Sequence, residues 1–294
     1  DPGVPIILSD DVAQKVPLRS SVKEIYDFII SDIQTAIPNL PDNNSGNRYR
    51  GSKGAAYSLL ARIYFYARNY AKAREYAELA LTNSPNTSLI DYTKVAVGSP
   101  IPTLDIRPDA LYARIGGTGF GPTMELRNSY DPNDRRIDLY FTPATVPTSR
   151  GEIRYSFGGE SALANNENAG TSVQEMKLII AEAAARRNDL KVALDQLNEV
   201  RKNRIDASAF KAYESTDQEF VLQKVLDERL FEFYGNGLRW LDMRRLDSEG
   251  RMPVVNRYDA KGNVIATLAP HSPRYTWQVP QFVIDFNPGM EQNP

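Results

Sequence analysis

The sequence predicts a mainly α-helical fold, in which helical hairpins are interrupted by a long irregular insertion with a few short strands. Three observations lead to this prediction. Two stretches, about 52–82 and 172–203, space their apolar residues as amphipathic helices do. Residues 84–171 lie between them and contain eight prolines and a cluster of glycines, which interrupt regular structure. A charged segment at 228–245 then ends one helix and starts another.

We interpret the chain, residues 1–294, as one domain with four zones. A helical repeat region occupies 20–83, and the loop-rich insertion occupies 84–171. A second helical repeat region with closing helices follows at 172–245. A hairpin and a coil tail complete the chain at 246–294.

The first zone opens with a helix that begins at Ser21. Ser21 and Glu24 stand three residues apart, which is the spacing of a capping box. An apolar series at helical spacing follows, namely Val22, Ile25, Ile29 and Ile33. Pro38 and Pro41 are expected to end this helix, because proline cannot continue a helical hydrogen-bond ladder.

Two predicted hairpins follow, one on each side of the insertion. The first joins helices at about 52–67 and 70–82 through a hinge at Asn69. The second joins helices at about 172–187 and 189–203.

The two hairpins repeat each other. Aligning Ala61 with Ala181 brings further positions into register: Leu60 with Ile180, Asn69 with Asp189, Ala73 with Ala193, Ala77 with Leu197, and Ala80 with Val200. Small residues allow antiparallel helices to touch closely. This spacing resembles the tetratricopeptide repeat, whose 34-residue units bury their apolar faces by stacking on neighbours. The alternative is two unrelated alanine-rich hairpins, but the joint match of the alanines and the turn favours the repeat.

A last long helix is predicted from Thr216 to Tyr234, with Thr216 and Glu219 as a second capping box. Its buried stripe is expected to contain Leu222, Leu226, Leu230 and Phe233. Gly235 and Gly237 end the helix.

The insertion and the tail are expected to be largely irregular. Alternation around Ile153, Tyr155 and Phe157 favours a short strand. Residues 259–263 are typical of a hairpin turn, and the final residues are expected to be coil. Trp277 is expected to pack the tail against the body.

Composition excludes several classes of function. The 35 basic and 37 acidic residues nearly cancel, so no basic field indicates a general nucleic-acid binder. The absence of cysteine excludes disulfides, thiolate metal sites and cysteine nucleophiles. The single histidine, His271, is expected to be exposed. Because the chain has only one histidine, sites that need two imidazoles are excluded. We expect no cofactor, and no apolar run is long enough to span a membrane.

The segment at 228–245, ERLFEFYGNGLRWLDMRR, is the most informative part of the chain. Charges this dense at the end of an apolar helix require partners, because a buried unpaired charge is costly. The charged positions considered are Glu228, Arg229, Glu232, Arg239, Asp242 and Arg244. Glu228 and Glu232 share one helix face, but a catalytic acid needs a raised pKa, which the surrounding arginines oppose. We therefore interpret the segment as a structural ion-pair network that joins this helix to Trp240.

Two motifs resemble known ligand-binding loops, but each lacks a residue that such a loop requires. The segment YDPNDRR at 130–136 is similar to a calcium loop, but Arg135 stands where a ligand oxygen is needed. A turn capped by Asp131 or Asn133 is favoured instead. The glycines at 116–121 lack the lysine of a phosphate loop. We therefore expect no metal site.

Five segments together resemble the SusD/RagB family of Bacteroidetes outer-membrane nutrient-binding lipoproteins. They are SVKEIYDFIISDIQTAIPNLP at 21–41, the first hairpin at 50–81, the second hairpin at 175–204, the charged segment at 228–245 and the tail NPGMEQNP at 287–294. Within the second hairpin the match includes Glu182, Ala183, Asn198 and Arg201. One departure is the Tyr234–Gly237 turn, where the family more often has a Glu-Gly pair.

A larger departure lies at the start of the chain. Family members usually carry a signal peptide, a lipidated cysteine and further repeat helices ahead of the position of Ser21. We expect the chain to be a mature or trimmed fragment, or a short variant. The first hairpin is then expected to show unusual apolar exposure, or to be covered by a partner.

The resemblance implies a non-catalytic binding protein on the outer face of the outer membrane, held by an N-terminal lipid anchor. Such proteins cap a TonB-dependent transporter of the SusC type and deliver a nutrient to it, most often a glycan and in some members a peptide. A rigid helical scaffold that holds irregular loops suits this role.

The insertion supplies the candidate ligand-binding residues. Sugars present flat apolar faces and many hydroxyls, which suit aromatic rings flanked by polar side chains. The residues considered are Tyr112, Arg114, Phe120, Arg127, Tyr130, Asp131, Tyr140, Phe141, Arg154, Tyr155 and Phe157. For each single ring the alternative is packing of the loops onto the helices. We select Tyr112, Arg114, Phe120 and Tyr155 as the ligand-binding residues.

Two other functions remain as alternatives. A tetratricopeptide-type scaffold would bind a protein or a peptide in its concave helical groove, whereas a glycan binder would use exposed rings on the loop face. A glycoside hydrolase acting through two carboxylates is weaker, because no enzyme motif with defined spacing is present. The tyrosines of the first hairpin are interpreted as packing: Tyr57, Tyr64, Tyr66, Tyr70 and Tyr76.

Overall fold

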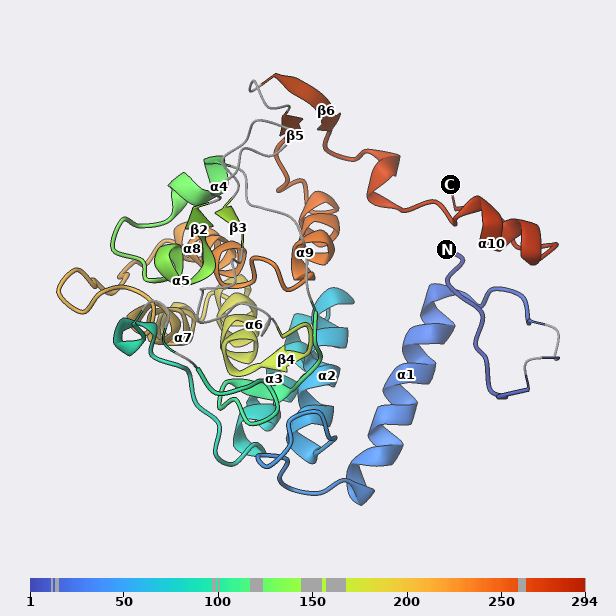
Figure 1. Ribbon diagram of the computed structural model, residues 1–294, viewed down its shortest axis with the longest axis horizontal. Coiled ribbons are helices and arrows are strands. Elements are labelled where there is room, and N and C mark those ends of the chain that lie inside the picture. The colour runs from blue at the N-terminus through green and yellow to red at the C-terminus, as the bar shows by residue number, and fades with distance from the viewer. Residues whose placement is uncertain are drawn as a thin grey trace.

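The fold is mainly helical, as predicted (Figure 1). The computed structural model describes residues 1–11, 13, 16–96, 99, 101–116, 124–143, 155–156, 168–258 and 263–293. The α-helices are α1 Val22–Ala36, α2 Lys53–Tyr66, α3 Tyr70–Thr82, α4 Met124–Ser129, α5 Arg136–Tyr140, α6 Val173–Arg186, α7 Leu190–Lys202, α8 Gln218–Glu232, α9 Leu238–Asp247 and α10 Gln281–Phe286. The strands are β1 Ala110–Tyr112, β2 Thr142–Pro143, β3 Tyr155–Ser156, β4 Thr171–Ser172, β5 Val255–Tyr258 and β6 Val264–Leu268. Short 3₁₀ turns lie at Ile37–Asn39, Tyr92–Lys94 and Pro273–Tyr275 (η3).

Helix α1 begins at the predicted capping box. The Ser21 hydroxyl accepts a hydrogen bond from the backbone N–H of Glu24, and the Glu24 carboxylate accepts one from the N–H of Ser21. Both orphan donors are therefore satisfied within the first turn. The predicted boundaries of the four hairpin helices are also confirmed to within two residues.

The turns of the two hairpins have the same geometry, which supports the predicted repeat. Arg68 and Asn188 both adopt a left-handed backbone, with φ of 60° and 61°. The following residues, Asn69 and Asp189, each donate a backbone hydrogen bond of 2.9 Å back into the preceding helix. The helices α2 and α6 also begin alike, because the hydroxyls of Ser52 and Ser172 each accept a bond from the N–H three residues on.

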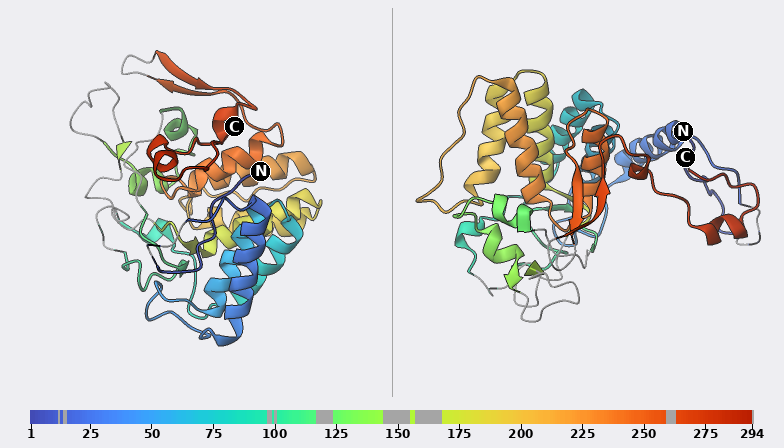
Figure 2. Two further views of the ribbon diagram at one scale, coloured as in Figure 1. Left: turned by 90° about the vertical axis from the view of Figure 1, so that its right-hand side faces the viewer. Right: turned by 90° about the horizontal axis from the view of Figure 1, so that it is seen from above.

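The two hairpins stack on one another although the insertion separates them in the sequence. Helix α3 packs against α6, and α6 also contacts α7 and α8 (Figures 1 and 2). Alanines allow the close approach, as predicted. The core at this junction contains Ala61, Ala73, Ala77, Ala80, Met176, Ile179 and Ile180. Helix α6 is consequently the most enclosed of the described helices, and twelve of its fourteen residues are buried.

The predicted start of α8 is wrong by one residue. Asp217, and not Thr216, caps this helix, and its carboxylate accepts bonds from the N–H groups of Glu219 and Phe220 at 2.9 and 3.2 Å. An aspartate can satisfy two orphan donors and also favours the positive end of the helix dipole. The predicted stripe is buried except for Leu230, which is half-buried.

Glycines separate α8 from α9, as predicted. Gly235 and Gly237 adopt left-handed backbones with φ of 82° and 86°, and Gly237 is the residue that precedes α9. Helix α9 then turns its apolar side, Met243 and Leu246, into the core that α6 and α8 share.

The described parts of the insertion form two small antiparallel pairs. Strand β1 pairs with β4, so that Ala110 lies opposite Ser172, and β2 pairs with β3. The aromatic residues around α5 are buried against each other, which confirms packing for Tyr130, Tyr140 and Phe141. Ile153 and Phe157 lie outside the described residues.

The tail differs from the prediction in two respects. Residues 281–286 form the short helix α10 where coil was expected. Trp277 contacts Trp240 but is 70% exposed, so it does not close over the body as expected. The strands β5 and β6 pair antiparallel, while four residues of the predicted turn, 259–262, lie outside the described residues. His271 is exposed, as predicted.

The chain ends lie beside each other, beyond α1 (Figures 1 and 2). Arg19 connects them, because its guanidinium donates to the carbonyl oxygens of Pro2, Gly3 and Glu291 and to the side chain of Asn293.

The expected apolar exposure lies on α1 and not on the first hairpin. Helix α1 has no buried residue, and Val22, Phe28 and Ile29 are exposed. Across 52–82, all of which the structure describes, no large apolar side chain is exposed. The reason is that α1 itself packs on α2, and Gln34 donates a hydrogen bond of 3.0 Å to the hydroxyl of Tyr76. Within the described residues, no helix has the length and apolar character that crossing a bilayer requires.

Substitution of Gly54 tests the close contact between α2 and the end of α3. A Cβ at Gly54 would lie 2.6 Å from the carbonyl oxygen of Asn83, which is backbone and cannot rotate away. We expect Gly54→Ala to lower the free energy of unfolding by about 1–3 kcal/mol, the usual cost of overpacking. Gly46→Ala is the matched control, because a Cβ there meets no atom within 4 Å. Urea unfolding measures both, and equal midpoints would contradict the contact.

Candidate ligand-binding site

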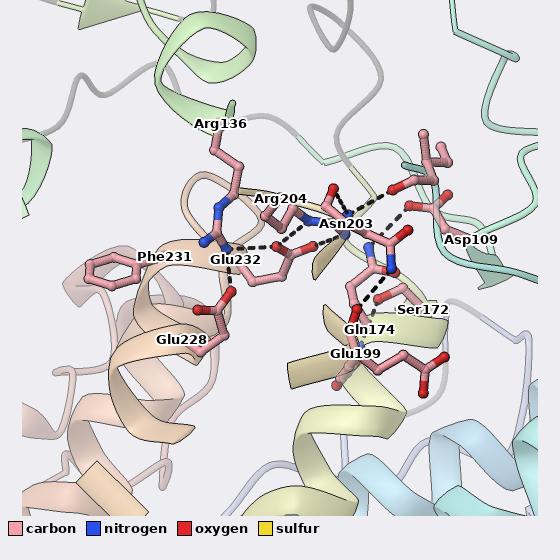
Figure 3. Close-up of polar contacts among 12 residues, drawn as sticks. Asp109, Arg136, Ser172, Gln174, Glu199, Asn203, Arg204, Glu228, Phe231 and Glu232 are labelled. Carbon is pink, nitrogen blue, oxygen red and sulfur yellow. Dashed lines mark hydrogen bonds and ion pairs between the residues drawn. The ribbon is translucent and has the colours of Figure 1, made fainter. Parts of the chain in front are cut away.

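The charged residues at the end of α8 belong to a buried ion network that joins three parts of the chain (Figure 3). Glu232 receives two hydrogen bonds from Arg204, at 2.8 and 2.6 Å, and one from Arg136 at 2.9 Å. Arg136 also donates to Glu228 at 2.8 Å and to Asp134 at 2.6 Å. All five side chains are at most 5% exposed. The network therefore fixes the insertion, through α5, against α8 and the segment after α7.

A second network connects α6, α8 and α9. Arg245 pairs with Glu182 of α6 and with Asp242 at 3.0 Å, and Arg229 pairs with Asp242 at 3.1 Å. Arg186 adds a bond of 2.8 Å to Glu182. Glu182 and Asp242 thus each have at least two cationic partners.

These networks confirm a structural role for the charged segment but correct its membership. Arg239 and Arg244 are not part of either network: Arg244 is exposed, and Arg239 has no ion pair within the described residues. The partners that sequence reasoning missed are Asp134, Arg136, Glu182, Arg186, Arg204 and Arg245. The only sign of these partners in the sequence was the presence of charged residues in an otherwise apolar helix, because a buried charge without a partner is costly.

The first network contains one more carboxylate than guanidinium. Asp134, Glu228 and Glu232 face Arg136 and Arg204. Burial raises the pKa of Glu228, and the neighbouring Asp134 and Glu232 act in the same direction. Glu228 shares Arg136 with both other carboxylates, so its negative charge is the least well balanced by positive charge among the three.

The selected residues Tyr112 and Arg114 lie at the outer end of β1. The strand is fixed to β4 by a close backbone contact, because a Cβ on Gly170 would collide with the carbonyl oxygen of Tyr112. Asn168 closes the ladder: its side-chain oxygen accepts bonds from the N–H groups of Arg114 and Gly170, at 3.0 and 2.9 Å. Only glycine fits at 170, so this backbone geometry is specified by the sequence.

Behind the ladder, Arg62 of α2 holds the β4 side in place. Its guanidinium donates to the carbonyl oxygens of Ala169 and Gly170, at 3.0 and 2.5 Å, and to both carboxylate oxygens of Glu175. The strand pair is therefore anchored on both helical hairpins.

The structure brings Tyr112 and Arg114 together. The guanidinium carbon of Arg114 lies 4.1 Å from the centre of the Tyr112 ring and the two side chains are also hydrogen-bonded. Arg114 is exposed and Tyr112 is half-buried. Phe120 lies outside the described residues, and Tyr155 is described only through its backbone pairing with Pro143. The pair is thus a solvent-facing cation–π unit on a rigid support.

The remaining motif has a structural role. Asp131 caps its own turn and accepts a bond of 2.8 Å from the N–H of Asn133, as predicted. Among the described residues, no group of three acidic or imidazole side chains has an arrangement that would hold a metal ion.

Two family models match the chain. The model described as SusD family matches residues 174–294, and the model described as starch-binding associating with outer membrane matches residues 2–65. No protein among those with curated functions matches at significant similarity.

Several solved structures share this fold. A SusD superfamily protein from Bacteroides thetaiotaomicron is 24% identical with a TM-score of 0.73, and the match covers 100% of this chain and 71% of that one. A SusD-like protein from Bacteroides fragilis is 17% identical with a TM-score of 0.68, covering 99% and 75%. A SusD-like carbohydrate binding protein from Bacteroides vulgatus is 17% identical with a TM-score of 0.67, covering 98% and 70%.

The molecule is therefore a mainly helical protein built on two stacked helical hairpins. Residues 174–294 match the SusD family model, and the whole chain has the fold of SusD superfamily proteins. Members of this family are binding proteins, which confirms the prediction that the protein is not an enzyme.

Removal of Glu232 tests the first network. Glu232→Ala leaves Arg204 buried without a carboxylate partner, so we expect a loss of about 3–5 kcal/mol in the free energy of unfolding. The control is Asp195→Asn, which breaks the exposed pair of Lys191 and Asp195 and should leave the unfolding midpoint unchanged. A Glu232→Ala midpoint that equals the control would show that the network contributes nothing.

Glu228→Gln tests the unequal charge count. The folded pKa of Glu228 is raised above its ordinary value of 4.5, so this group contributes stability that is fully present below pH 4.5 and is lost as the pH rises through the folded pKa. The glutamine variant has no such titration and should keep that stability at neutral pH. Unfolding curves measured from pH 4.5 to 8 should therefore converge at the acid end, and curves that stay parallel would refute the assignment.

Proposed function

We propose that this protein binds a glycan at the cell surface, without catalysis, and delivers it to a TonB-dependent transporter of the SusC type. Family membership supports a binding role, and one similar structure is described as carbohydrate binding. The family model that matches residues 2–65 is described as starch-binding and as associating with the outer membrane. We place the protein on the outer face of that membrane, held by a lipid anchor.

The observation that carries the proposal is the paired Tyr112 and Arg114 at the solvent-facing end of β1. A sugar ring presents an apolar face that suits the tyrosine ring and hydroxyls that suit the guanidinium. Because both hairpins anchor the β1–β4 ladder, the pair is pre-organised and little ordering is needed on binding. We include Phe120 and Tyr155 in the same site, and we take residues 1–294 as one SusD-like domain.

A peptide-binding scaffold is less well supported. In a tetratricopeptide scaffold, the first helices of each repeat line an open groove. Here α6, the first helix of the second hairpin, is buried along twelve of its fourteen residues. Its polar positions are already occupied, since Glu175 binds Arg62 and Glu182 binds Arg245. Little of this helix is left for a peptide.

Substitution of the pair tests the proposed site. We expect Tyr112→Ala and Arg114→Gln each to weaken glycan binding roughly tenfold, which corresponds to ~1.4 kcal/mol. A glycan array identifies the ligand, and calorimetry with that oligosaccharide measures the loss. Tyr26→Ala on α1 is the matched control, because Tyr26 is also half-buried but lies on a different element.

Three results would count against the proposal. Unchanged glycan affinity in both variants would show that the glycan does not bind at β1. Loss of glycan affinity in the Tyr26 variant alone would show that the glycan binds at α1 instead. Preferential binding of unstructured peptides over every glycan on the array would favour the scaffold function.

A further inference from the structure

The two tryptophans of the chain lie in one aromatic cluster, away from β1. Trp240, in the first turn of α9, has its ring centre 5.6 Å from that of Trp277 and 5.7 Å from that of Tyr275. Trp240 and Tyr275 rest on the core that α6, α8 and α9 share. Trp277 is 70% exposed, so a large aromatic ring is presented to solvent on a fixed aromatic base. An arrangement of this kind suits the apolar face of a ring ligand.

A cation without a partner adjoins this cluster. Arg239 is half-buried at the start of α9 and makes no ion pair or hydrogen bond within the described residues. Burial lowers its pKa, and the nearby Asp242 only partly offsets this effect. Asp242 is already bound by Arg229 and Arg245, at 3.1 and 3.0 Å. A half-buried guanidinium of this kind lacks the anion that would offset its desolvation.

Tyr275 adds an unused hydrogen-bonding group. Its side chain is 5% exposed, and its hydroxyl is buried without a hydrogen-bond partner within the described residues. Burial raises the pKa of Tyr275, so the hydroxyl keeps its proton and remains a donor. Arg239 immediately precedes Trp240 in α9, and the Trp240 ring centre lies 5.7 Å from that of Tyr275, so Arg239 and Tyr275 both adjoin Trp240.

We propose that Arg239, Trp240, Tyr275 and Trp277 form a second binding site, whose ligand is a sugar ring that carries a carboxylate. The ring stacks on Trp277, and its carboxylate accepts hydrogen bonds from the Arg239 guanidinium and the Tyr275 hydroxyl. The aromatic contact selects a flat apolar ring face, and the guanidinium selects a negative charge. This inference rests on the aromatic cluster alone and does not depend on the site at β1.

A purely structural role explains the cluster less well. Native proteins satisfy nearly all buried polar groups, yet within the described residues the buried Tyr275 hydroxyl has no hydrogen-bond partner, and the half-buried Arg239 has no carboxylate partner. The buried arginines of the charged segment, Arg229 and Arg245, are in contrast paired with carboxylates. Packing alone would also leave no reason for Trp277 to be 70% exposed.

Intrinsic fluorescence provides a direct test, because the chain contains two tryptophans and both are in the cluster. The full chain is titrated with trimers of galacturonic acid and of glucuronic acid, and with the methyl ester of each trimer as the uncharged counterpart. We expect a saturable change in tryptophan emission with an acidic trimer. Binding should weaken as salt is added, because the cation is partly exposed and can be screened. The esters should bind about 10- to 100-fold more weakly, the usual cost of a lost charged hydrogen bond.

Three variants separate the ligand role from a structural role. Trp277→Ala should abolish the saturable change, while the control Phe286→Ala on α10, where the ring is 84% exposed, should retain it. Arg239→Gln should weaken binding about 10- to 100-fold. Tyr275→Phe should weaken binding about 2- to 10-fold without lowering the thermal midpoint, because it removes a hydroxyl that has no partner. This last variant keeps the test valid if Arg239→Gln folds poorly.

Several outcomes would overturn the inference. They are the absence of any saturable change with both acidic trimers, equal binding of the acids and their esters, and wild-type affinity in both Arg239→Gln and Tyr275→Phe. Tyr112→Ala serves as the cross-check between sites. If it abolishes the emission change, the ligand acts through β1 and the second site is rejected; if it leaves the change intact, the two sites are independent.

Discussion

The buried pairing of arginines with carboxylates is the constraint on which the rest of the structure depends. Arg136 belongs to the insertion, Arg204 follows α7, and Glu232 ends α8, yet their charged groups meet within 3 Å. A desolvated ion is strongly unfavourable unless its partner is present, so any other placement of the insertion would leave at least one charge unpaired. Such pairs need not stabilise a fold more than apolar residues would. Their effect here is to select one arrangement of the loops over the alternatives.

This selection matters because the loops of the insertion cannot fix their own positions. Tyr112 lies on the β1–β4 strand pair, in which neither strand is longer than three residues. An isolated strand pair of that size is not stable in water. The two strands are held instead by groups from the helices: Arg62 of α2, Glu175 and the capping Ser172 of α6. The repeated hairpins therefore act as the rigid part, and the irregular face takes its geometry from them.

Local features of the fold were predictable from the sequence, whereas distant pairings were not. The capping box at Ser21, the turn at Asn69 and the glycine break before α9 depend on neighbouring residues, and all three are confirmed. Arg136 and Glu232 are 96 residues apart, and no spacing rule connects them. Stacking of the two hairpins was likewise hidden by the insertion. The contact between Tyr112 and Arg114 is also local, because residues two apart in an extended segment lie on the same face. The unpaired Arg239 was not, because the sequence does not show which of several adjacent arginines finds a carboxylate.

The clasp formed by Arg19 has a practical consequence for how the molecule can be held. It fixes the first residues to Glu291 and Asn293 with bonds of 2.7 and 2.5 Å, so both ends leave the body at one place. A linker attached at either end would therefore emerge from the same side and impose the same orientation. Fusing the two ends through a short linker would therefore require little rearrangement.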